Sequence, residues 1–481
     1  MTAAANPSAD GVLAARIGLW LGPLLLLACL LSNPPAGMSA PAWAAVGLVL
    51  LMACWWATEA LPIPVTALLP LLLTPALGIG TLEQAAAPYA NPTIFLFLGG
   101  FLIGLAMQRW NLHRRIALLT LLAMGSQPKR QIAGFMLATA FLSMWVSNTA
   151  TSIMMLPIGL SVIGLLGADD NDRESQRFAT ALLLSIAYAA SIGGIATLIG
   201  TPPNALLAAF LQQNYGIRIG FGQWMLIGVP VAVLMLAFTW WWLTRHGFEL
   251  RNQGTETLIR NEVAALGLLS PGEKRVGAVF IATAMAWIFQ PLLSVYVAGI
   301  NDTSIALAAG VALFIVPAGA GHRVFLMDWA SAVRLPWGVL LLFGGGLSLA
   351  SAIRVTGLAE WIAQGLGAIG TLPVLLTMAL VVIVIIFLTE VTSNTATAAV
   401  FLPMLGAIAV AQGIAPELLA IPAAIAASCA FMMPVATPPN AIVFGSGHLR
   451  IQSMIRAGLM LNIAGILVVT LLSYWLVRWI W

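Results

Sequence analysis

The sequence predicts an all-helical integral membrane protein with about 11 transmembrane segments, built as two inverted repeats with re-entrant hairpins and broken helices. Three observations predict this fold. Hydrophobic residues make up 61% of the 481 positions and charged residues 7%, whereas soluble domains are about a quarter charged. Apolar runs close to the ~20 residues that cross a bilayer recur through the chain. The same ordered set of polar motifs also occurs once in each half.

The apolar runs are the first element of this prediction. The clearest are Ile17–Leu31, Ala42–Ala57, Ile94–Met107, Trp224–Leu243 and Leu459–Val477. The first run follows a single basic residue, Arg16, and lacks a small-residue cleavage site, so we interpret it as a retained span rather than a signal peptide. The chain is therefore expected to be a multi-pass protein of the cell membrane, such as the inner membrane of a bacterium.

The loops give the predicted orientation, because loops rich in arginine and lysine face the cytoplasm. The segment Arg109–Arg130 carries five basic residues, and placing it inside makes the N-terminus cytoplasmic and the C-terminus external. The same path puts most other basic loop residues inside, namely Arg173, Arg177, the loop Arg245–Arg275, Arg323, Arg334, Arg450 and Arg456, and leaves Arg218, Arg354 and Arg478 outside. This path requires Ile132–Leu166 and Leu372–Val410 each to enter and leave on one side, as re-entrant hairpins.

An internal repeat supports the hairpins. Three motifs recur in order: Phe97-Leu98-Gly99-Gly100 as Leu342-Phe343-Gly344-Gly345, Ser147-Asn148-Thr149-Ala150-Thr151 as Ser393-Asn394-Thr395-Ala396-Thr397, and Thr201-Pro202-Pro203-Asn204-Ala205 as Thr437-Pro438-Pro439-Asn440-Ala441. Because the first hairpin enters from inside and the second from outside, the two repeats are predicted to be inverted.

Inverted repeats with interrupted helices are typical of secondary transporters, whose binding site forms near the midplane where broken helices meet. Four breaks are predicted: the hairpin tips Ser147–Thr149 and Ser393–Thr395, and the two Thr-Pro-Pro-Asn stretches, where tandem prolines stop a helix. Freed carbonyls, hydroxyls and amides suit a cation such as sodium, and free N–H groups suit an anion. A lone Ser-Asn-Thr more often hydrogen-bonds within its own helix, but its duplication beside Pro-Pro breaks favours a binding site.

Charged residues are scarce near these breaks. No lysine or arginine falls within a tip or a Pro-Pro stretch, so bound cations and helix N-termini would have to offset the charge of an anionic substrate. Glu59 and Glu390 lie in apolar sequence, where carboxylates are functional candidates. Structural or solvated roles fit them equally well, and both stay outside the predicted site.

Other function classes are disfavoured by what the sequence lacks. The basic residues are scattered, which argues against a nucleic-acid partner, and the histidines and the three cysteines show no metal or disulfide spacing. No Gly-x-Ser-x-Gly or His-Glu-x-x-His motif indicates an enzyme, and no charged ring or repeated filter indicates a channel. No cofactor is expected beyond a coupling ion.

At these motifs the chain resembles the divalent anion/sodium symporter family, the INDY-type di- and tricarboxylate transporters. The resemblance covers nearly the full length and includes Trp55-Trp56-Ala57-Thr58-Glu59-Ala60-Leu61-Pro62-Ile63-Pro64, which is similar to the family's early signature. It implies a homodimer in which a mobile transport domain slides, elevator-fashion, against a scaffold domain. The implied parts are scaffold helices at 1–130 and 275–370, a cytoplasmic linker at 245–274, and transport-domain parts at 131–244 (hairpin 131–166) and 371–481 (hairpin 371–411).

The resemblance also implies the site residues. Sodium site 1 would use Ser143, Ser147, Asn148 and Gly200, and sodium site 2 would use Thr389, Ser393, Asn394 and Ala436. The substrate would touch Asn148, Thr149, Thr201, Pro202, Asn394, Thr395, Thr437 and Pro438. Gly200 and Ala436 would contribute backbone carbonyls, for which small residues suffice.

The expected function is sodium-coupled symport of a di- or tricarboxylate such as succinate, malate, fumarate or citrate, with Na+, the carboxylate, membrane lipid and a second copy of the chain as partners. Two alternatives within the family remain open: sodium-independent dicarboxylate exchange, and sulfate transport. A third is an arsenite or proton/sodium transporter of the wider superfamily, which would depend more on intramembrane acids than on paired Ser-Asn-Thr tips.

Overall fold

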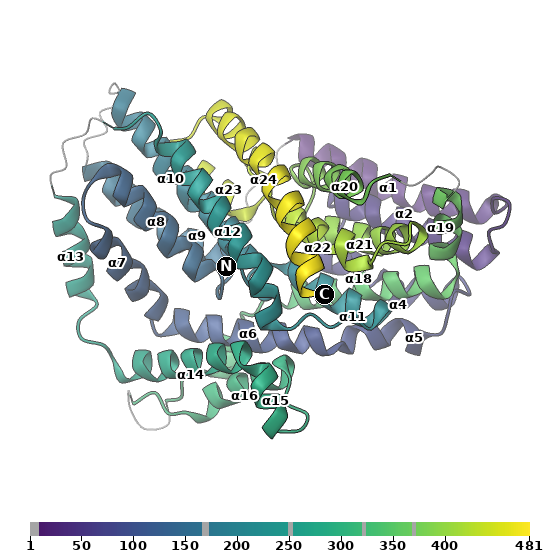
Figure 1. Ribbon diagram of the computed structural model, residues 1–481, viewed down its shortest axis with the longest axis horizontal. Helices are drawn as coiled ribbons and strands as arrows, with labels where there is room; N and C mark the ends of the chain where they lie inside the picture. The colour runs from purple at the N-terminus through teal and green to yellow at the C-terminus, as the bar shows by residue number, and fades with distance from the viewer. Residues whose placement is uncertain (1–8, 166–172, 249–253, 320–323, 368–371) are drawn as a thin grey trace. The chain divides into compact units, whose positions relative to one another are not determined.

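The computed structural model describes residues 9–165, 173–248, 254–319, 324–367 and 372–481 (Figure 1). Over these residues the chain is helical, and the only strand-like pairing is an isolated bridge between Pro317 and Phe325. The prediction of an all-helical fold is confirmed.

The first half contains the helices α1 to α13, and α13 lies within the predicted linker at 245–274. They are α1 (Ala9–Leu31), α2 (Ala40–Thr58), α3 (Ile63–Thr66), α4 (Leu69–Ala76), α5 (Leu82–Ala86), the 3-10 helix η1 (Ala87–Ala90), α6 (Pro92–Arg109), α7 (Leu112–Met124), α8 (Pro128–Ser143), α9 (Asn148–Leu165), α10 (Arg173–Ile195), α11 (Pro202–Tyr215), α12 (Phe221–Thr244) and α13 (Thr255–Ala265).

The second half begins with α14. Its helices are α14 (Pro271–Ile288), α15 (Gln290–Tyr296), α16 (Asp302–Ile315), α17 (Trp329–Ala332), α18 (Trp337–Val355), α19 (Leu358–Gly367), α20 (Val374–Thr389), α21 (Asn394–Ala411), α22 (Pro416–Ala427), α23 (Pro438–Phe444) and α24 (Ile451–Ile480). The series α8 to α12 therefore has the same order of long and interrupted helices as the series α20 to α24, as the motif repeat predicts.

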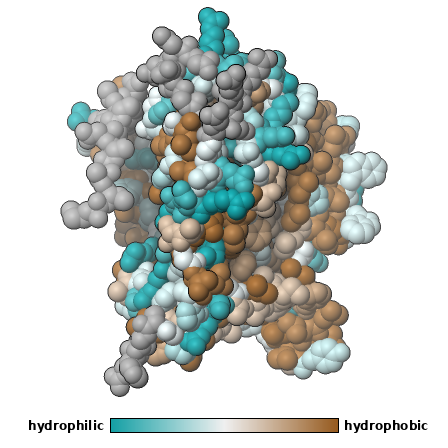
Figure 2. All heavy atoms as spheres, turned by 90° about the vertical axis from the view of Figure 1, so that its left-hand side faces the viewer, coloured by the Kyte–Doolittle hydropathy of each residue, from teal (hydrophilic) through white to brown (hydrophobic). Residues whose placement is uncertain are grey.

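Many of these helices are suited to a bilayer. Among the described residues, nine are long and apolar enough to span it, or ten if the bent pair α14 and α15 is one span. About 11 segments were expected, and the remaining apolar sequence forms shorter helices, including α16, α20 and α22. Large apolar side chains such as Trp20, Leu31 and Trp475 are exposed, and hydrophobic residues cover broad areas of the face drawn in Figure 2. Lipid is the environment that suits such a surface.

The chain forms two compact units, and each contains segments from both halves. Unit 1 contains residues 1–94, 206–218 and 336–427, and unit 2 contains residues 95–205, 219–335 and 428–481. In unit 2, α10 is almost entirely buried and packs against α8, α9, α12 and α23. This helix is the core of the unit, and its C-terminal end supplies part of the site described below.

A buried ion pair fixes the predicted linker to unit 2. Arg115 of α7 is 6% exposed and Glu273 of α14 is 4% exposed, and Arg115 Nε donates to Glu273 Oε1 at 2.6 Å. The same guanidinium donates to the carbonyls of Gly267 at 3.0 Å and Leu266 at 3.3 Å. Arg115 thus pairs with a buried carboxylate and also donates to two backbone carbonyls near the end of the linker.

Arg115→Ala is expected to destabilise the protein by about 3–5 kcal/mol, because it leaves Glu273 buried without its partner. Arg114→Ala is the matched control. Arg114 pairs with Glu262 at 2.6 Å on the surface, with side chains 43% and 38% exposed, and such a pair contributes at most about 1 kcal/mol. Thermal unfolding of the purified protein compares the two variants, and equal losses would show that the buried pair has no special role.

Candidate binding site at the helix breaks

The first hairpin tip brings three oxygen-bearing groups together. Ser143, the last residue of α8, is fully buried, and its Oγ lies 2.6 Å from Asn148 Oδ1 and 2.7 Å from the Ala190 carbonyl. A hydroxyl has one hydrogen to donate and can satisfy only one of these acceptors. The cluster therefore holds more acceptors than its own hydroxyl can pair.

The Asn148 amide can present either of its faces to this cluster. Turned over, its Nδ2 lies 2.6 Å from Ser143 Oγ and 3.2 Å from the carbonyls of both Ala190 and Gly200. The amide orientation follows from the hydrogen bonds around it rather than from its shape. The amide nitrogen can thus satisfy the surrounding oxygens when no ion is bound, and the amide oxygen can join them when a cation is present.

The second tip repeats this geometry within unit 1. Thr389, the last residue of α20, is fully buried, and its Oγ1 lies 2.7 Å from Asn394 Oδ1 and 2.9 Å from the Ala427 carbonyl. In both tips the hydroxyl stands five residues before the asparagine. In both tips the third oxygen is an alanine carbonyl of the next helix, α10 or α22. The duplicated motifs therefore build duplicated clusters.

The two Thr-Pro-Pro-Asn stretches each end one half-helix and begin the next. Pro202 begins α11 and Pro438 begins α23, positions where proline loses no helical hydrogen bond. Thr437 caps α23, since its hydroxyl accepts from Asn440 N at 3.3 Å. The break thus forms where the tandem prolines predict it, and the threonine completes the new N-terminus.

The motif asparagines tie the break to the preceding segment. Asn204 Nδ2 donates to the Thr197 carbonyl at 2.8 Å, and Asn440 Nδ2 donates to the Met433 carbonyl at 3.0 Å. Both residues are fully buried, yet within the described residues neither amide oxygen accepts a hydrogen bond. A buried acceptor without a partner is costly, so water or a cation is the expected partner. These asparagines had no predicted role, although their repetition in both motifs was a visible signal.

Inside unit 2, the first Thr-Pro-Pro-Asn stretch lies close to the segment that follows α22 and leads to the second stretch. The hydroxyls of Thr201 and Ser428 lie 3.4 Å apart, and α23 packs against α9 and α10. Gly194 lies so close to Asn148 that an added Cβ would be 2.8 Å from its Oδ1. A larger residue there would displace the Asn148 side chain, so glycine lets α10 approach the hairpin tip without moving that amide.

An aromatic cluster holds the first tip in place. Trp145 stacks on Phe221 at a centroid distance of 5.9 Å and on Trp287 at 6.4 Å, and meets Phe280 edge-on at 4.9 Å. Aromatic pairs at these distances contribute about 0.5–1.5 kcal/mol each beyond their buried area. These contacts fix the position of the tip, and hence of Asn148, against α12 and α14.

The structure brings together only some of the predicted site residues. Ser143, Asn148 and Gly200 converge, whereas the exposed Ser147 accepts from Ala150 N at 3.2 Å and so caps α9. Thr389 and Asn394 converge in unit 1, while Ala436 belongs to unit 2. The full ligand sets therefore stay predictions. The carbonyls of Ala190 and Ala427 were not foreseen, because no side-chain pattern marks a backbone oxygen.

The remaining predicted substrate residues lie at the same breaks. Thr149 and Thr395 are the second residues of α9 and α21, and Thr201, Thr437 and Thr395 are buried. Of the two acids left open by the sequence, Glu390 is buried beside the second tip. Glu59 is exposed and closes α2 in a left-handed conformation, with φ of 48°. Glu59 thus has a structural role at a helix end.

Comparison with known proteins identifies relatives along almost the whole chain. The family model described as the sodium:sulfate symporter transmembrane region matches residues 18–481. A protein of Staphylococcus saprophyticus named sodium-dependent dicarboxylate transporter SdcS is 43% identical over 472 residues, covering 96% of this chain and 91% of the relative. The protein of the same name from Staphylococcus aureus USA300 is also 43% identical over 472 residues, covering 95% of this chain and 90% of the relative.

Two solved structures share the fold at low sequence identity. The Alcanivorax borkumensis YdaH transporter, described as having an unusual topology, aligns with a TM-score of 0.57 at 16% identity and covers 96% of this chain and 98% of its own. Neisseria gonorrhoeae MtrF, described among antimetabolite efflux pumps, aligns with a TM-score of 0.53 at 13% identity and covers 96% and 94%. The likeness supports the predicted fold class, because each alignment extends over nearly the whole of both chains.

Gly200→Ala is expected to lower thermal stability by about 1–3 kcal/mol, since its methyl group would collide with the Gly194 backbone and overpacking costs that amount. The matched control is Gly164→Ala in α9, an exposed position with no atom close to the added methyl group. There alanine should be neutral or stabilising by up to about 1 kcal/mol. Thermal unfolding measures both variants, and shifts of the same sign would contradict the packing described here.

Proposed function

The chain belongs to the sodium:sulfate symporter family, and on that premise we propose that it is a secondary active transporter that couples the uptake of a dicarboxylate to sodium. The observation that carries the proposal is the pair of matching oxygen clusters, one at Ser143 and Asn148 and the other at Thr389 and Asn394. A structural hydrogen-bond network would not need the same arrangement twice, at the same place in each repeat.

Each cluster has the ligand chemistry that sodium requires. Hydroxyl, amide and carbonyl oxygens are hard ligands, and hard cations prefer oxygen. In the first cluster these are Ser143 Oγ, the Asn148 amide oxygen and the carbonyls of Ala190 and Gly200. Binding would rotate the Asn148 amide so that its oxygen replaces its nitrogen. The gain from coordination must exceed the loss of those hydrogen bonds, which makes occupancy depend on sodium concentration.

At each tip, the helix start beside the cation site would help to bind the anion. The N-termini of α9 and α21 lie at Asn148 and Asn394, and a helix N-terminus provides free N–H groups and a positive dipole end. Thr149 and Thr395 can add hydroxyl donors. Since no arginine or lysine lies at the breaks, the anion would bind well only with its cations, and that requirement is the basis of coupling.

We propose a dicarboxylate such as succinate, malate or fumarate as the substrate class. Relatives named sodium-dependent dicarboxylate transporters are 43% identical over nearly the full length. Sulfate, which the family description names, and citrate are the competing substrates. Sodium-independent exchange of one dicarboxylate for another is the competing mechanism.

The proposed assembly follows the resemblance noted above. The transporter would be a homodimer in the cytoplasmic membrane, with the N-terminus inside and the C-terminus outside. Residues 131–244 and 371–481 would form the moving part, and residues 1–130 and 275–370 the scaffold. Light scattering of the purified protein in detergent tests the dimer, and a monomer as the only species would refute it.

Single cysteines at Ser147 and Ser393, in a chain lacking Cys29, Cys54 and Cys429, test the inverted hairpins. Membrane-impermeant thiol reagents should label residue 147 from the cytoplasmic side and residue 393 from the outside, each in one conformational state, because the two tips enter from opposite faces. Labelling of both positions from one side only would exclude this topology.

Uptake of labelled succinate into proteoliposomes tests the function. An inward sodium gradient should drive accumulation, and replacing sodium with choline should remove it. Asn148→Ala and Asn394→Ala should each lower the initial rate at limiting sodium at least about tenfold, since each removes an oxygen from a cation site, and a hydrogen bond to a charged group contributes about 1.5–3 kcal/mol.

Asn214→Ala is the matched control, because the Asn214 side chain donates to the Phe210 carbonyl of its own helix and, among the described residues, makes no other side-chain hydrogen bond. It should transport as the unmodified protein does. Full activity of both tip variants at limiting sodium would refute the cation sites. Succinate uptake that ignores sodium but is accelerated by internal dicarboxylate would identify an exchanger, and uptake of sulfate in place of succinate would change the substrate class.

A further inference from the structure

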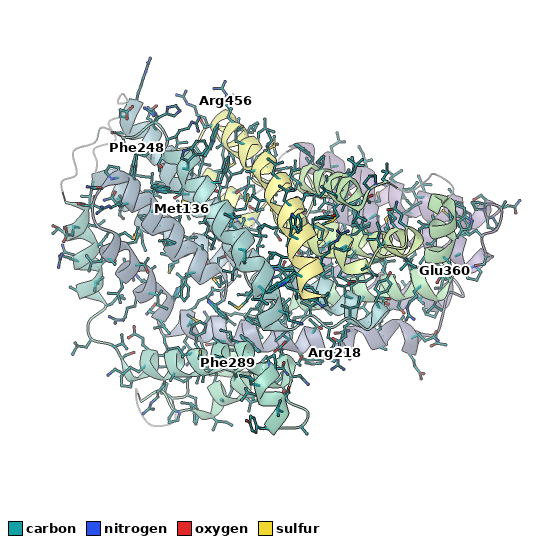
Figure 3. The ribbon with its side chains drawn as sticks, viewed as in Figure 1. Met136, Arg218, Phe248, Phe289, Glu360 and Arg456 are labelled. Atoms are coloured by element: carbon teal, nitrogen blue, oxygen red, sulfur yellow. The ribbon has the colours of Figure 1, made fainter. Side chains whose placement is uncertain are left out.

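Unit 2 contains a cavity whose lining residues belong neither to the hairpin tips nor to the Thr-Pro-Pro-Asn stretches. Its volume is about 710 Å³, within the range of small-molecule sites. It lies where α10 begins, α12 ends and α24 begins, at the end of the unit where Figure 3 labels Phe248 and Arg456. None of the residues predicted to bind sodium or substrate lines it.

The lining of this cavity is strongly basic. Four arginines and two histidines take part: Arg173, Arg177, Arg245, Arg450, His246 and His448. Among the described residues that line it, none is an aspartate or a glutamate. Of the four arginines in this lining, Arg177 alone forms an ion pair with an acidic residue that the structure describes, namely Glu174. The other three guanidinium groups form no ion pair with a carboxylate of the described residues, and like charges gathered in one cavity favour an anion as ligand.

Two of these side chains, Arg245 and His448, make contacts within the cavity wall. The Arg245 guanidinium stacks 3.4 Å above the Trp242 ring and donates to the Trp242 carbonyl at 2.7 Å. The His448 ring nitrogen Nδ1 lies 3.0 Å from the Ser446 carbonyl. Arginine has five N–H donors, so Arg245 keeps most of them for a ligand. Side chains fixed before binding lose less entropy when a ligand arrives.

We propose that this cavity binds a phosphate group, carried by the headgroup of an anionic phospholipid or by a soluble phosphate ester. Guanidinium groups match the geometry of phosphate oxygens with paired hydrogen bonds. The hydroxyls of Thr180 and Ser453 add neutral donors in the same lining, whereas the Ser446 hydroxyl donates to the Val443 carbonyl at 2.6 Å. The loop charges predict that this end of the molecule faces the cytoplasm, where both sources of phosphate occur, and basic pockets between membrane helices on that side suit lipid headgroups.

A bound phosphate would connect parts of the chain that lie far apart in the sequence. Arg173 and Arg177 belong to α10, Arg245 follows α12, and Arg450 precedes α24. The Ser446–Arg450 segment directly follows α23, the short helix that begins at the second Pro-Pro stretch. The ligand would therefore fix the end of α23 against α10 and α12 and stabilise unit 2.

The test uses the purified full-length protein in sodium-free buffer. Its melting temperature is titrated with glycerol 3-phosphate in detergent, and compared between nanodiscs of phosphatidylcholine alone and nanodiscs that also contain phosphatidylglycerol. Stabilisation by the first probe identifies a soluble ester as a source, and stabilisation by the second identifies a lipid headgroup. The triple variant R173Q/R245Q/R450Q should bind the effective probe roughly 100-fold more weakly, since each arginine near an anionic group contributes about fivefold.

The matched control is K129Q/R130Q/R334Q, which removes the same charge from exposed residues outside the cavity and should bind as the unmodified protein does. If the triple variant fails to fold, Arg173→Gln alone should weaken binding about fivefold. Stabilisation by neither probe would overturn the proposal. Equal losses in the cavity variant and the control would also overturn it, as would a probe that binds the cavity variant with unchanged affinity.

Discussion

The structure depends on one constraint, which is that a backbone group freed inside a membrane must find another partner. The four helix breaks free such groups, and at each break nearby residues provide hydrogen-bond partners. At the Pro-Pro stretches, Asn204 and Asn440 donate to the carbonyls of Thr197 and Met433, which lie in the turns that precede the new half-helices. At the hairpin tips, Ser143 and Thr389 each have two acceptors and one hydrogen. When the Asn148 amide oxygen faces the first cluster, the cluster has more acceptors than donors, and a cation can satisfy that excess.

Duplication carries this local chemistry to both halves without identical residues. The first tip uses a serine and the second a threonine, and both place a hydroxyl against an asparagine and an alanine carbonyl. Aromatic stacking around Trp145 fixes the position of the first tip. Gly194 and Gly200 pack closely against each other, and Gly194 also lies against the Asn148 side chain. At the first tip, these contacts hold the clustered oxygens a few ångströms apart.

Much of this could be predicted from the sequence because the breaks have residue signatures. Tandem prolines stop helices, and the predicted tips coincide with the starts of α9 at Asn148 and α21 at Asn394. What escaped prediction depends on tertiary contact. The carbonyls of Ala190 and Ala427 have no signature, and Arg115 looked like one more loop charge although it is buried against Glu273. The sequence indicated only that three further arginines face the cytoplasm, namely Arg173, Arg245 and Arg450. Their convergence on one cavity becomes visible only in the folded structure.

Hydrogen exchange of the backbone amides tests the central claim, that the two tips form equivalent cation sites. The measurement compares the purified protein in sodium with the protein in choline at equal ionic strength, following peptides that contain Asn148 and Asn394. Sodium should slow exchange at both tips, because coordination restrains the carbonyls and the starts of α9 and α21, and should leave the surface helix α13 unchanged. Exchange at both tips that does not respond to sodium would contradict the account, and a response at one tip alone would contradict the equivalence of the two halves.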